Sequence, residues 1–348
     1  MGLPVLRLPS LVFGNVYRFL DGPEIIFLSQ CSEKMKDVVK SHVPRGLKIN
    51  VHVDKRSCEI YIPVGILRWH LRINDNPEVP VGREVIRNDG AIVHGMVGLT
   101  TRESKNKLMS VMKEEFFEEK ILAIVGMLRE VFNCSIGTFE YTFGHTTFPK
   151  LILLTNAFHR ADEIFIYDHF YFTEELNFML DNFVADSLVF NAYGDPEYSY
   201  QKPLNFPEIY LGSARWIDLA KLLEMAQTSW HINLNTVELI SDEELNQFIT
   251  WWLGSDNNTL KMVSIDREDP DDERDVDVIM EGIPSTPGRA KRREALINGV
   301  PRHNYQNGLD IRRHDGLLAT VLVQESSFVL AVWHHPNPNV QIVIDNNI

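Results

Sequence analysis

The chain has 348 residues, of which 44% are hydrophobic and 24% are charged, the composition of a globular protein with a packed core. Its 34 basic and 48 acidic residues give a formal net charge of -14, which argues against binding to nucleic acid or to an anionic membrane surface. The cysteines lack any CxxC pairing, and the sequence has no secretory signal and no membrane-spanning apolar run. We therefore expect an intracellular protein of the cytoplasm or nucleus.

The first predicted element is a module of three short helices within residues 8–43. Apolar residues recur at helical spacing after Pro9, and the Asp-Gly-Pro sequence of residues 21–23 predicts the end of one helix and the start of the next. Ser32 is a suitable N-cap for the third helix. A module of this size buries little apolar surface by itself, so we expect it to bind a partner.

A mixed β/α connecting module is predicted over residues 46–145. Alternating polar and apolar residues predict strands over residues 48–53, 58–62, 85–86 and 91–93. Residues 100–132 begin with a capping-box sequence and keep a roughly helical apolar spacing, so they predict one long helix. Residues 136–143 then alternate again, with the aromatic face expected to be buried.

Strand and helix alternate repeatedly in the body that follows, residues 146–348. Short apolar runs predict strands over residues 164–166, 188–190, 209–211, 232–234 and 262–265. Helical patterns lie between most of them, at a repeat of roughly 20 to 30 residues, which is typical of solenoid proteins. The sequence predicts irregular, leucine-rich-repeat-like strand-helix units, with an irregular α/β layer as the alternative.

The clearest helix of this body covers residues 241–254. It begins at Ser241 with a capping box that includes Glu244, and its apolar residues keep helical spacing. We expect Gly254 to occupy the C′ position that ends the helix.

An exposed loop is predicted over residues 266–300, because acidic residues and then a basic cluster leave little apolar surface to bury. The basic cluster, Arg289, Lys291, Arg292 and Arg293, is alternatively a nuclear-import signal. Ser285 or Thr286 is alternatively a phosphorylation site. A flexible surface loop with balanced charge is the favoured interpretation.

A small antiparallel β element closes the chain. Residues 308–313 and 318–323 predict a hairpin that turns at Asp315 and Gly316, and residues 328–333 predict a third strand. The predicted fold class is therefore α/β: an N-terminal three-helix module, a body of irregular strand-helix repeats and a C-terminal antiparallel β element.

The N-terminal module resembles an F-box over residues 1–45. The resemblance rests on the Leu-Pro opening, the periodic apolar residues after it, the Glu24-Ile25 pair and the Leu-Ser-Gln-Cys-Ser sequence of residues 28–32. At residues 10–11 the sequence departs from the pattern, because many F-boxes have a polar residue followed by Glu there. The resemblance implies binding to the Skp adaptor and, through it, to the cullin of an SCF-type ubiquitin ligase. The implied adaptor-binding residues are Leu8, Pro9, Val12, Val16, Leu20, Ile25 and Leu28.

Two later blocks resemble the nematode family of F-box proteins that carry an F-box-associated domain. They are residues 234–260, with Trp251 and Trp252, and residues 310–333, with the Asp-Ile-Arg-Arg-His-Asp-Gly sequence. The resemblance implies that residues 146–348 form the F-box-associated domain and that it captures a target protein, which the sequence does not identify.

The sequence offers no catalytic constellation. It lacks phosphate-binding glycine loops, a nucleophile elbow and zinc-like spacings of Cys or His, so no catalytic residue, metal or cofactor is predicted. We expect a substrate-recognition subunit that is not an enzyme. The alternatives are a non-catalytic interaction scaffold without a ubiquitin role and an enzyme hidden in the repeat body.

Overall fold

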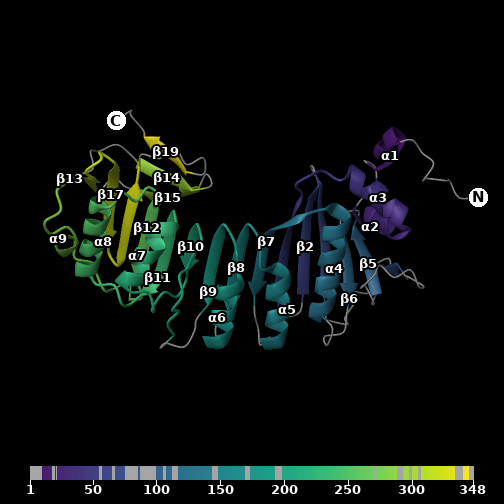
Figure 1. Cartoon of the computed structure of the whole chain (residues 1–348), viewed down its shortest axis with the longest axis horizontal. Coiled ribbons are helices and arrows are strands. Elements are labelled where there is room, and N and C mark those ends of the chain that lie inside the picture. Colours follow the sequence, from purple (N-terminus) through teal and green to yellow (C-terminus); the bar gives the residue numbers. More distant parts are fainter. Residues whose placement is uncertain are drawn as a thin grey trace, which may run out of the picture. The chain divides into compact units, whose positions relative to one another are not determined.

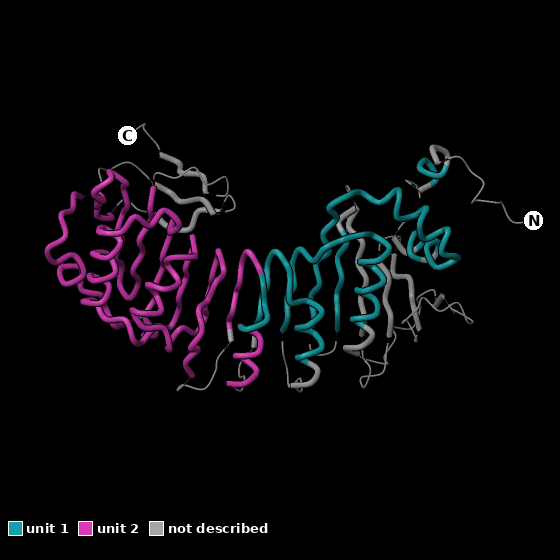
Figure 2. The backbone as a smooth tube through the Cα atoms, viewed as in Figure 1, with its two compact units in different colours: residues 1–168, 181–184 teal, residues 169–180, 185–348 magenta. Residues whose placement is uncertain are grey.

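The structure is a computed structural model that divides into two compact units (Figure 2). Unit 1 comprises residues 1–168 and 181–184, and unit 2 comprises residues 169–180 and 185–348. The domain boundaries expected after residues 45 and 145 stay predictions. The residues that the structure describes are 10–17, 20, 22–54, 57–64, 67–74, 85–86, 99–104, 107–111, 117–142, 148–168, 173–192, 198–269, 271–287, 293–297, 300–304, 307–333 and 340–344.

Unit 1 begins with the three predicted helices, which are labelled in Figure 1. They are α1 (Ser10–Tyr17), α2 (Gly22–Gln30) and α3 (Glu33–His42). Pro23 lies in the first turn of α2, where its missing N–H costs no helical hydrogen bond. Ser32 caps α3, because its Oγ accepts a hydrogen bond from the Met35 backbone N–H at 3.1 Å.

The sheet of unit 1 mixes parallel and antiparallel pairs, in the order β8-β7-β1-β2-β3-β6-β5-β4. β1 pairs in parallel with β7, and β7 pairs in parallel with β8. The strands are β1 (Lys48–Asp54), β2 (Ser57–Val64), β3 (Leu67–Asn74), β4 (Val85–Ile86), β5 (Leu99–Ser104), β6 (Lys107–Val111), β7 (Ser135–Thr142) and β8 (Glu163–Asp168).

Two helices of unit 1, α4 (Phe117–Phe132) and α5 (Phe148–Phe158), cover the sheet. The aromatic face of β7 is buried as predicted, since Phe139 and Tyr141 are 1% and 3% exposed. Phe139 also stacks on Phe158 of α5, with ring centroids 4.5 Å apart. The helix α5 was not predicted from the sequence.

The single long helix expected over residues 100–132 is wrong in its first part. Residues 99–104 and 107–111 are the strands β5 and β6, which pair with each other, and β6 also pairs in parallel with β3. The residues taken for a capping box, Thr100 to Glu103, lie in β5. Pairing with strands distant in sequence overrides the local capping pattern here. The hairpin expected at Asp89 and Gly90 and the strand at residues 91–93 lie outside the described residues.

Unit 2 contains a succession of parallel strands separated by helices. β9, β10, β11 and β12 pair in parallel in that order. These elements are α6 (Thr173–Asn182), β9 (Ser187–Ala192), β10 (Glu208–Leu211), α7 (Leu219–Thr228), β11 (His231–Val237), α8 (Asp242–Gly254) and β12 (Met262–Arg267). The mixed α/β architecture is thus confirmed, whereas classification of the units as leucine-rich-repeat-like stays a prediction.

The predicted capping box of α8 is present. The Glu244 N–H donates to Ser241 Oγ, and the Ser241 N–H donates to Glu244 Oε2 at 2.9 Å. The expected C′ glycine is wrong, because Gly254 is the last helical residue and Ser255 follows it in an extended conformation. The Ser255 N–H bonds to the Trp252 carbonyl, so the helix ends without a left-handed residue.

The loop expected over residues 266–300 is mostly exposed in its described first half, as predicted, but it is more structured than expected. The segment contains the short helix α9 (Val276–Ile279) and β13 (Ser285–Pro287), and it buries both Arg274 and Ile279. Arg274 can be buried because the carboxylate of Asp242 faces it. Ser285 and Thr286 are exposed on β13, and three residues of the basic cluster, 289, 291 and 292, lie outside the described residues.

The predicted C-terminal hairpin is present. β16 (Leu309–Arg312), β17 (Leu318–Gln324) and β18 (Ser327–Val332) pair antiparallel, and β18 joins them to β12. The first turn contains Gly316 at φ +89°, a conformation that favours glycine. A separate small sheet contains β14 (Arg293–Ile297), β15 (Val300–Asn304) and β19 (Val340–Ile344).

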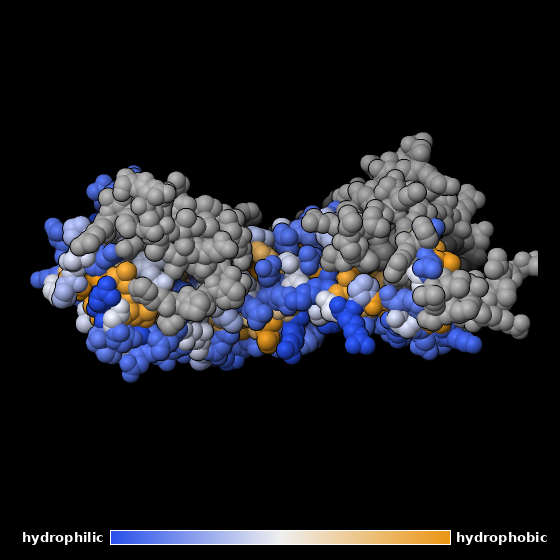
Figure 3. All heavy atoms as spheres, turned by 90° about the horizontal axis from the view of Figure 1, so that it is seen from above, coloured by the Kyte–Doolittle hydropathy of each residue, from blue (hydrophilic) through white to orange (hydrophobic). Residues whose placement is uncertain are grey.

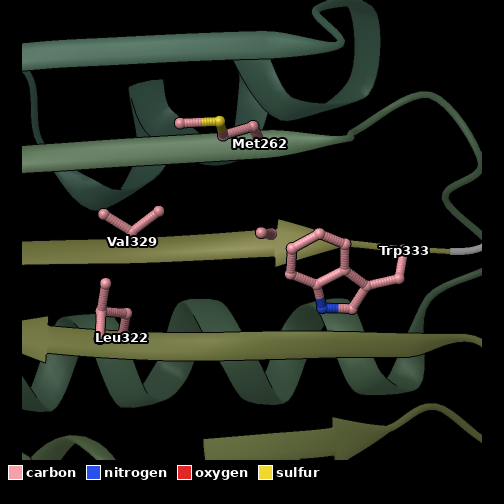
Figure 4. Close-up of a cluster of buried hydrophobic side chains, with 5 residues drawn as sticks. Met262, Leu322, Val329 and Trp333 are labelled. Atoms are coloured by element: carbon pink, nitrogen blue, oxygen red, sulfur yellow. The ribbon is translucent and has the colours of Figure 1, made fainter. Parts of the chain in front are cut away.

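Apolar side chains of β12 pack against those of the C-terminal hairpin and hold the two together (Figure 4). Met262, Leu322, Val329, Ala331 and Trp333 form a buried cluster, with Trp230 and Leu318 packed against it. The Trp333 indole N–H donates to Thr320 Oγ1 at 2.6 Å, which satisfies its polar atom inside the cluster.

Candidate functional site

The three N-terminal helices share a small core. Its buried members are Phe13, Ile25, Ile26, Met35, Val39 and Val43. The Phe13 ring meets the His42 ring edge-on, with centroids 5.0 Å apart, which brings α1 against the end of α3. In α2 the Ser29 hydroxyl donates to the Ile26 carbonyl at 2.7 Å. The module is therefore packed by few side chains, and each has a large share in its stability.

Several apolar side chains of this helical module remain accessible. Val16 on α1 is 40% exposed, and Leu20 and Leu28 are half-buried. Ile25, by contrast, is 1% exposed and belongs to the core of the module. Leu8 and Pro9 lie outside the described residues, and Val12 lies in α1. Val16, Leu20 and Leu28 are thus at least partly accessible. Elsewhere on the described surface, Figure 3 shows small apolar areas among mostly hydrophilic residues.

Charged side chains link the helical module to α4 of the same unit. Lys36 Nζ lies 2.8 Å from Glu130 Oε1 and 3.1 Å from Glu33 Oε2, and Lys40 Nζ lies 3.7 Å from Glu130 Oε1. The hydrogen bond with Glu130 raises the pKa of Lys36 and lowers the pKa of Glu130. Both groups are therefore charged over a wide pH range, and α3 is held against α4 by charge as well as by packing.

Residues 234–260 and 310–333, which resemble parts of an F-box-associated domain, contact each other at α8. Arg313 is buried, and its guanidinium carbon lies 5.4 Å from the centroid of the Trp252 ring. The guanidinium also donates to Asp315 and to the Asn257 carbonyl, which lies beyond the end of α8. Residues far apart in the sequence thus hold the C-terminal hairpin to α8.

Comparison with known families assigns both regions. The F-box domain family matches residues 5–45, which include the helical module. The F-box associated family matches residues 200–265, from the loop before β10 to β12. The chain therefore contains a region that matches an F-box domain and a region that matches an F-box-associated domain. This domain composition is typical of adaptor and interaction proteins rather than of enzymes, and F-box domains generally bind Skp-family adaptors.

A relative extends over nearly the whole chain. "Uncharacterized protein F59B2.8" of Caenorhabditis elegans is 23% identical over 359 aligned positions, which cover 95% of this chain and 77% of the relative. This relative is consistent with the resemblance to the nematode family. No solved structure is significantly similar to the chain.

The described part of the chain offers no candidate metal site, and its two buried cysteines are poorly suited to act as nucleophiles. Within the described ranges, no group of three or more His, Cys, Asp or Glu side chains could hold a metal ion. Burial raises the pKa of Cys134 to about 11 and raises the pKa of Cys58 as well, so both thiols are weak nucleophiles. No helix among the described residues is long and apolar enough to cross a membrane.

The link between the F-box and α4 was missed by sequence reasoning, because no local pattern singles out Glu130 as a partner of Lys36. We expect Glu130→Gln to speed backbone hydrogen exchange in α3 by about twofold at neutral pH, the scale of an exposed ion pair. The lowered pKa of Glu130 means that its contribution exists above the ordinary glutamate pKa and is lost as pH falls through the folded value. Exchange in the variant and in the wild type should therefore converge in acid.

Glu33→Gln is the matched control for this prediction, because Glu33 pairs with the same lysine but lies within α3. This substitution leaves the ion pair between Lys36 and Glu130 intact. It should therefore speed backbone hydrogen exchange in α3 less than Glu130→Gln does. Equal effects of the two substitutions at neutral pH would show that the link to α4 does not hold the F-box.

Proposed function

We propose that this protein is a substrate-recognition subunit of an SCF-type ubiquitin ligase. Its F-box binds a Skp-family adaptor and, through it, the cullin, and its F-box-associated domain binds a target protein. The observation that carries the proposal is the presence of both domains in one chain, in this order. The chain acts by proximity, since holding a target near the ubiquitin carrier raises its effective concentration there.

The adaptor-binding surface is proposed to contain Leu8, Pro9, Val12, Val16, Leu20 and Leu28. The exposure of Val16 and the partial exposure of Leu20 and Leu28 support this assignment, because an adaptor would bury apolar surface that is now accessible. Ile25 contributes by stabilising the module, since it is buried within it.

The target-binding surface is proposed to lie on the strand-helix units of unit 2. We infer that these units are irregular leucine-rich-repeat-like repeats, in which parallel strands present a continuous row of side chains. The parallel pairing of β9 to β12 supports this inference.

Substitution of the Leu-Pro opening tests the adaptor assignment. The double variant Leu8→Ala with Pro9→Ala is expected to lose most adaptor co-purification, because each lost apolar anchor removes about 1 to 3 kcal/mol of binding free energy. The control is Leu239→Ala, which truncates a residue of unit 2 that is 53% exposed and should leave adaptor binding unchanged. Unchanged adaptor co-purification by the folded double variant would exclude the proposed F-box contact.

An interaction scaffold without a ubiquitin role is the second candidate function. The ion pairs of Lys36 and Lys40 with Glu130 favour it, because they are what an internal helical cap would form. Deletion of residues 1–45 separates the two candidates. The scaffold is the correct function if two results are obtained together. The intact chain does not bind the adaptor, and the chain without residues 1–45 folds and still binds the same interaction partners as the intact chain.

A further inference from the structure

The sequence contains a single hydroxyl residue that is followed directly by proline. Of the 17 prolines in the chain, only Pro287 has a serine or threonine before it, and that residue is Thr286. Proline-directed protein kinases select the residue before a proline, whose fixed φ and missing N–H distinguish it from all other residues. Several of these kinases also prefer a basic residue two positions beyond the proline, where this sequence has Arg289. Thr286 therefore has the sequence that such a kinase requires.

Thr286 lies on an edge strand of unit 2. Its strand β13 has three residues, all of them exposed, and stands at the end of the strand order next to β16 (Figure 1). A strand this short is held to the sheet by few hydrogen bonds and opens at small cost. Thr286 is therefore accessible in an extended segment, the form in which a binding cleft takes up a peptide strand.

The chain before β13 is anchored, so β13 can separate without the rest of unit 2. Asn246 Nδ2 of α8 donates to the Ile279 carbonyl at 2.9 Å and to the Glu281 carbonyl at 2.8 Å. Ile283 is buried, and its N–H bonds to the Met280 carbonyl at 3.1 Å. The anchored part thus extends to Ile283, two residues before β13 begins.

The residue opposite Thr286 is an acid. In the antiparallel pair of β13 and β16, Thr286 stands directly across from Asp310, so the two side chains project from the same face of the sheet. Asp310 Oδ1 accepts from Thr320 Oγ1 at 2.6 Å, and Thr320 Oγ1 accepts from the Trp333 indole N–H at 2.6 Å. The Asp310 carboxylate is therefore held beside Thr286 by a network that leads to the buried cluster of the hairpin.

We propose that Thr286 is a phosphorylation site and that its phosphate releases β13 from β16. A proline-directed kinase transfers the γ-phosphoryl group of ATP to Thr286 Oγ1. The new O–P bond forms as the bond to ADP breaks, and the hydroxyl proton passes to the catalytic base of the kinase. The phosphate carries about two negative charges at neutral pH and stands across from the Asp310 carboxylate. Like charges directly opposite each other destabilise a strand pair, so β16 becomes the edge of the sheet.

One cation of β16 projects from the same face as Asp310. It is Arg312, two residues further along the strand, whose Nη1 donates to the Gly316 carbonyl in the hairpin turn at 2.8 Å. The pairs of β13 run from Ile311 to Leu309, away from that turn. The guanidinium is therefore directed away from Thr286, and it leaves the repulsion by Asp310 in place.

The first test is phosphorylation of the purified full-length chain by an active cyclin-dependent kinase with ATP and Mg²⁺, followed by intact-mass spectrometry. We expect the wild type to gain one phosphate group and Thr286→Ala to gain none. Pro287→Ala should react at least about tenfold more slowly, because the kinase loses the residue that it selects. The control is Ser285→Ala, which changes the other exposed hydroxyl of β13 and should react like wild type. No phosphate on the wild type, or equal phosphate on Thr286→Ala, overturns the proposal.

Backbone hydrogen exchange of the phosphorylated chain then measures the release of β13. We expect the β16 amides that face β13 to exchange about tenfold faster than in the unphosphorylated chain, the scale of charge repulsion at this separation. Exchange in α9 should stay unchanged, since Asn246 anchors that segment. Unchanged or slower exchange in β16 overturns the release of β13.

Asp310→Asn separates the charge from the shape of the side chain. Asparagine keeps an acceptor for Thr320 Oγ1 but removes the negative charge opposite Thr286. Phosphorylation should then speed exchange in β16 much less than it does in the wild type. An equal effect in the two proteins overturns the electrostatic mechanism.

Salt gives a second test of the charge that needs no variant. At about 1 M KCl the Debye length is about 3 Å, so the exposed phosphate and the Asp310 carboxylate are screened from each other. Most of the exchange difference between the phosphorylated and unphosphorylated wild type should disappear. A difference that does not depend on salt overturns the electrostatic mechanism.

These measurements are independent of the ubiquitin-ligase role. They use the purified chain without an adaptor or a target. Failure of the wild type to bind the adaptor would exclude that role and leave the Thr286 site in place, whereas failure of phosphorylation would exclude the site and leave the role in place.

Discussion

Arg313→Ala is expected to lower the free energy of unfolding of unit 2 by about 3 kcal/mol or more. The side chain is fully buried, and four of its hydrogen bonds would be lost together. Nε and Nη2 donate to the two carboxylate oxygens of Asp315 at 3.1 and 2.7 Å, Nη1 donates to the Asn257 carbonyl at 2.5 Å, and Nη2 donates to Asn258 Oδ1 at 2.9 Å. The guanidinium would also leave a cavity beside Trp252.

The effect reaches further because Asn257 connects several elements. Its side-chain amide donates to the Ala226 carbonyl in α7 at 2.7 Å, and its Oδ1 accepts from the Thr259 and Leu260 backbone N–H groups. Arg313 thus fixes the loop that leads from α8 into β12. Arg313→Lys should recover only part of the loss, since an ammonium cannot reproduce the planar fork.

Urea unfolding followed by tryptophan fluorescence measures this change. The matched control is Arg312→Ala, which removes the adjacent, exposed arginine, whose Nη1 donates to the Gly316 carbonyl at 2.8 Å. It should cost less than about 1 kcal/mol. If the two alanine variants unfold at the same urea concentration, Arg313 does not connect the hairpin to α8.

Much of the fold was predictable because its signals are local. The Ser241 capping box, the Ser32 cap and the turn at Gly316 depend on residues within a few positions of one another. The parallel strands β8 to β12 were predicted from short apolar runs, since such strands are buried on both faces or on most of their length. The F-box was recognisable for the same reason, as its motif is contiguous.

The missed features depend on partners distant in sequence. Residues 99–111 carry a helix-like pattern but pair as strands, because β3 offers β6 a free edge. Glu130 was not singled out in the sequence, because its partner Lys36 lies far away along the chain, on α3.

The role of Asp242 also depends on partners distant in sequence, and its expected effect on stability is larger. Its place in the first turn of α8 predicts only a favourable interaction with the helix dipole, which is typically about 0.3 to 1 kcal/mol. In the structure its Oδ1 accepts from Arg267 Nη2 at 2.8 Å and from Arg274 Nη1 at 3.1 Å, and its Oδ2 accepts from the Asp275 N–H at 2.8 Å. The carboxylate therefore attaches α9 and the preceding loop to α8.

Asp242→Ala should lower the free energy of unfolding by about 3 to 5 kcal/mol, because it leaves the charge of Arg274 buried without a counter-charge. The Arg274 side chain is 0% exposed, and within the described part of the chain its Nε and Nη2 already lack hydrogen-bond partners. Burial lowers the pKa of this guanidinium, and the hydrogen bond with Asp242 opposes that shift. Glu243→Ala is the control, since it removes an exposed acid from the same helical turn and isolates the dipole contribution.

A double-mutant cycle separates the pair from its surroundings. If the cost of Asp242→Ala arises from the unpaired charge, Asp242→Leu combined with Arg274→Met should unfold within about 1 kcal/mol of the wild type, because a buried ion pair often contributes little beyond well-packed apolar residues. Additive losses in the double variant would instead assign the cost to the hydrogen bonds with Arg267 and Asp275. In that case Asp242 stabilises the loop through its geometry, and Arg274 is a separate buried charge that the domain tolerates.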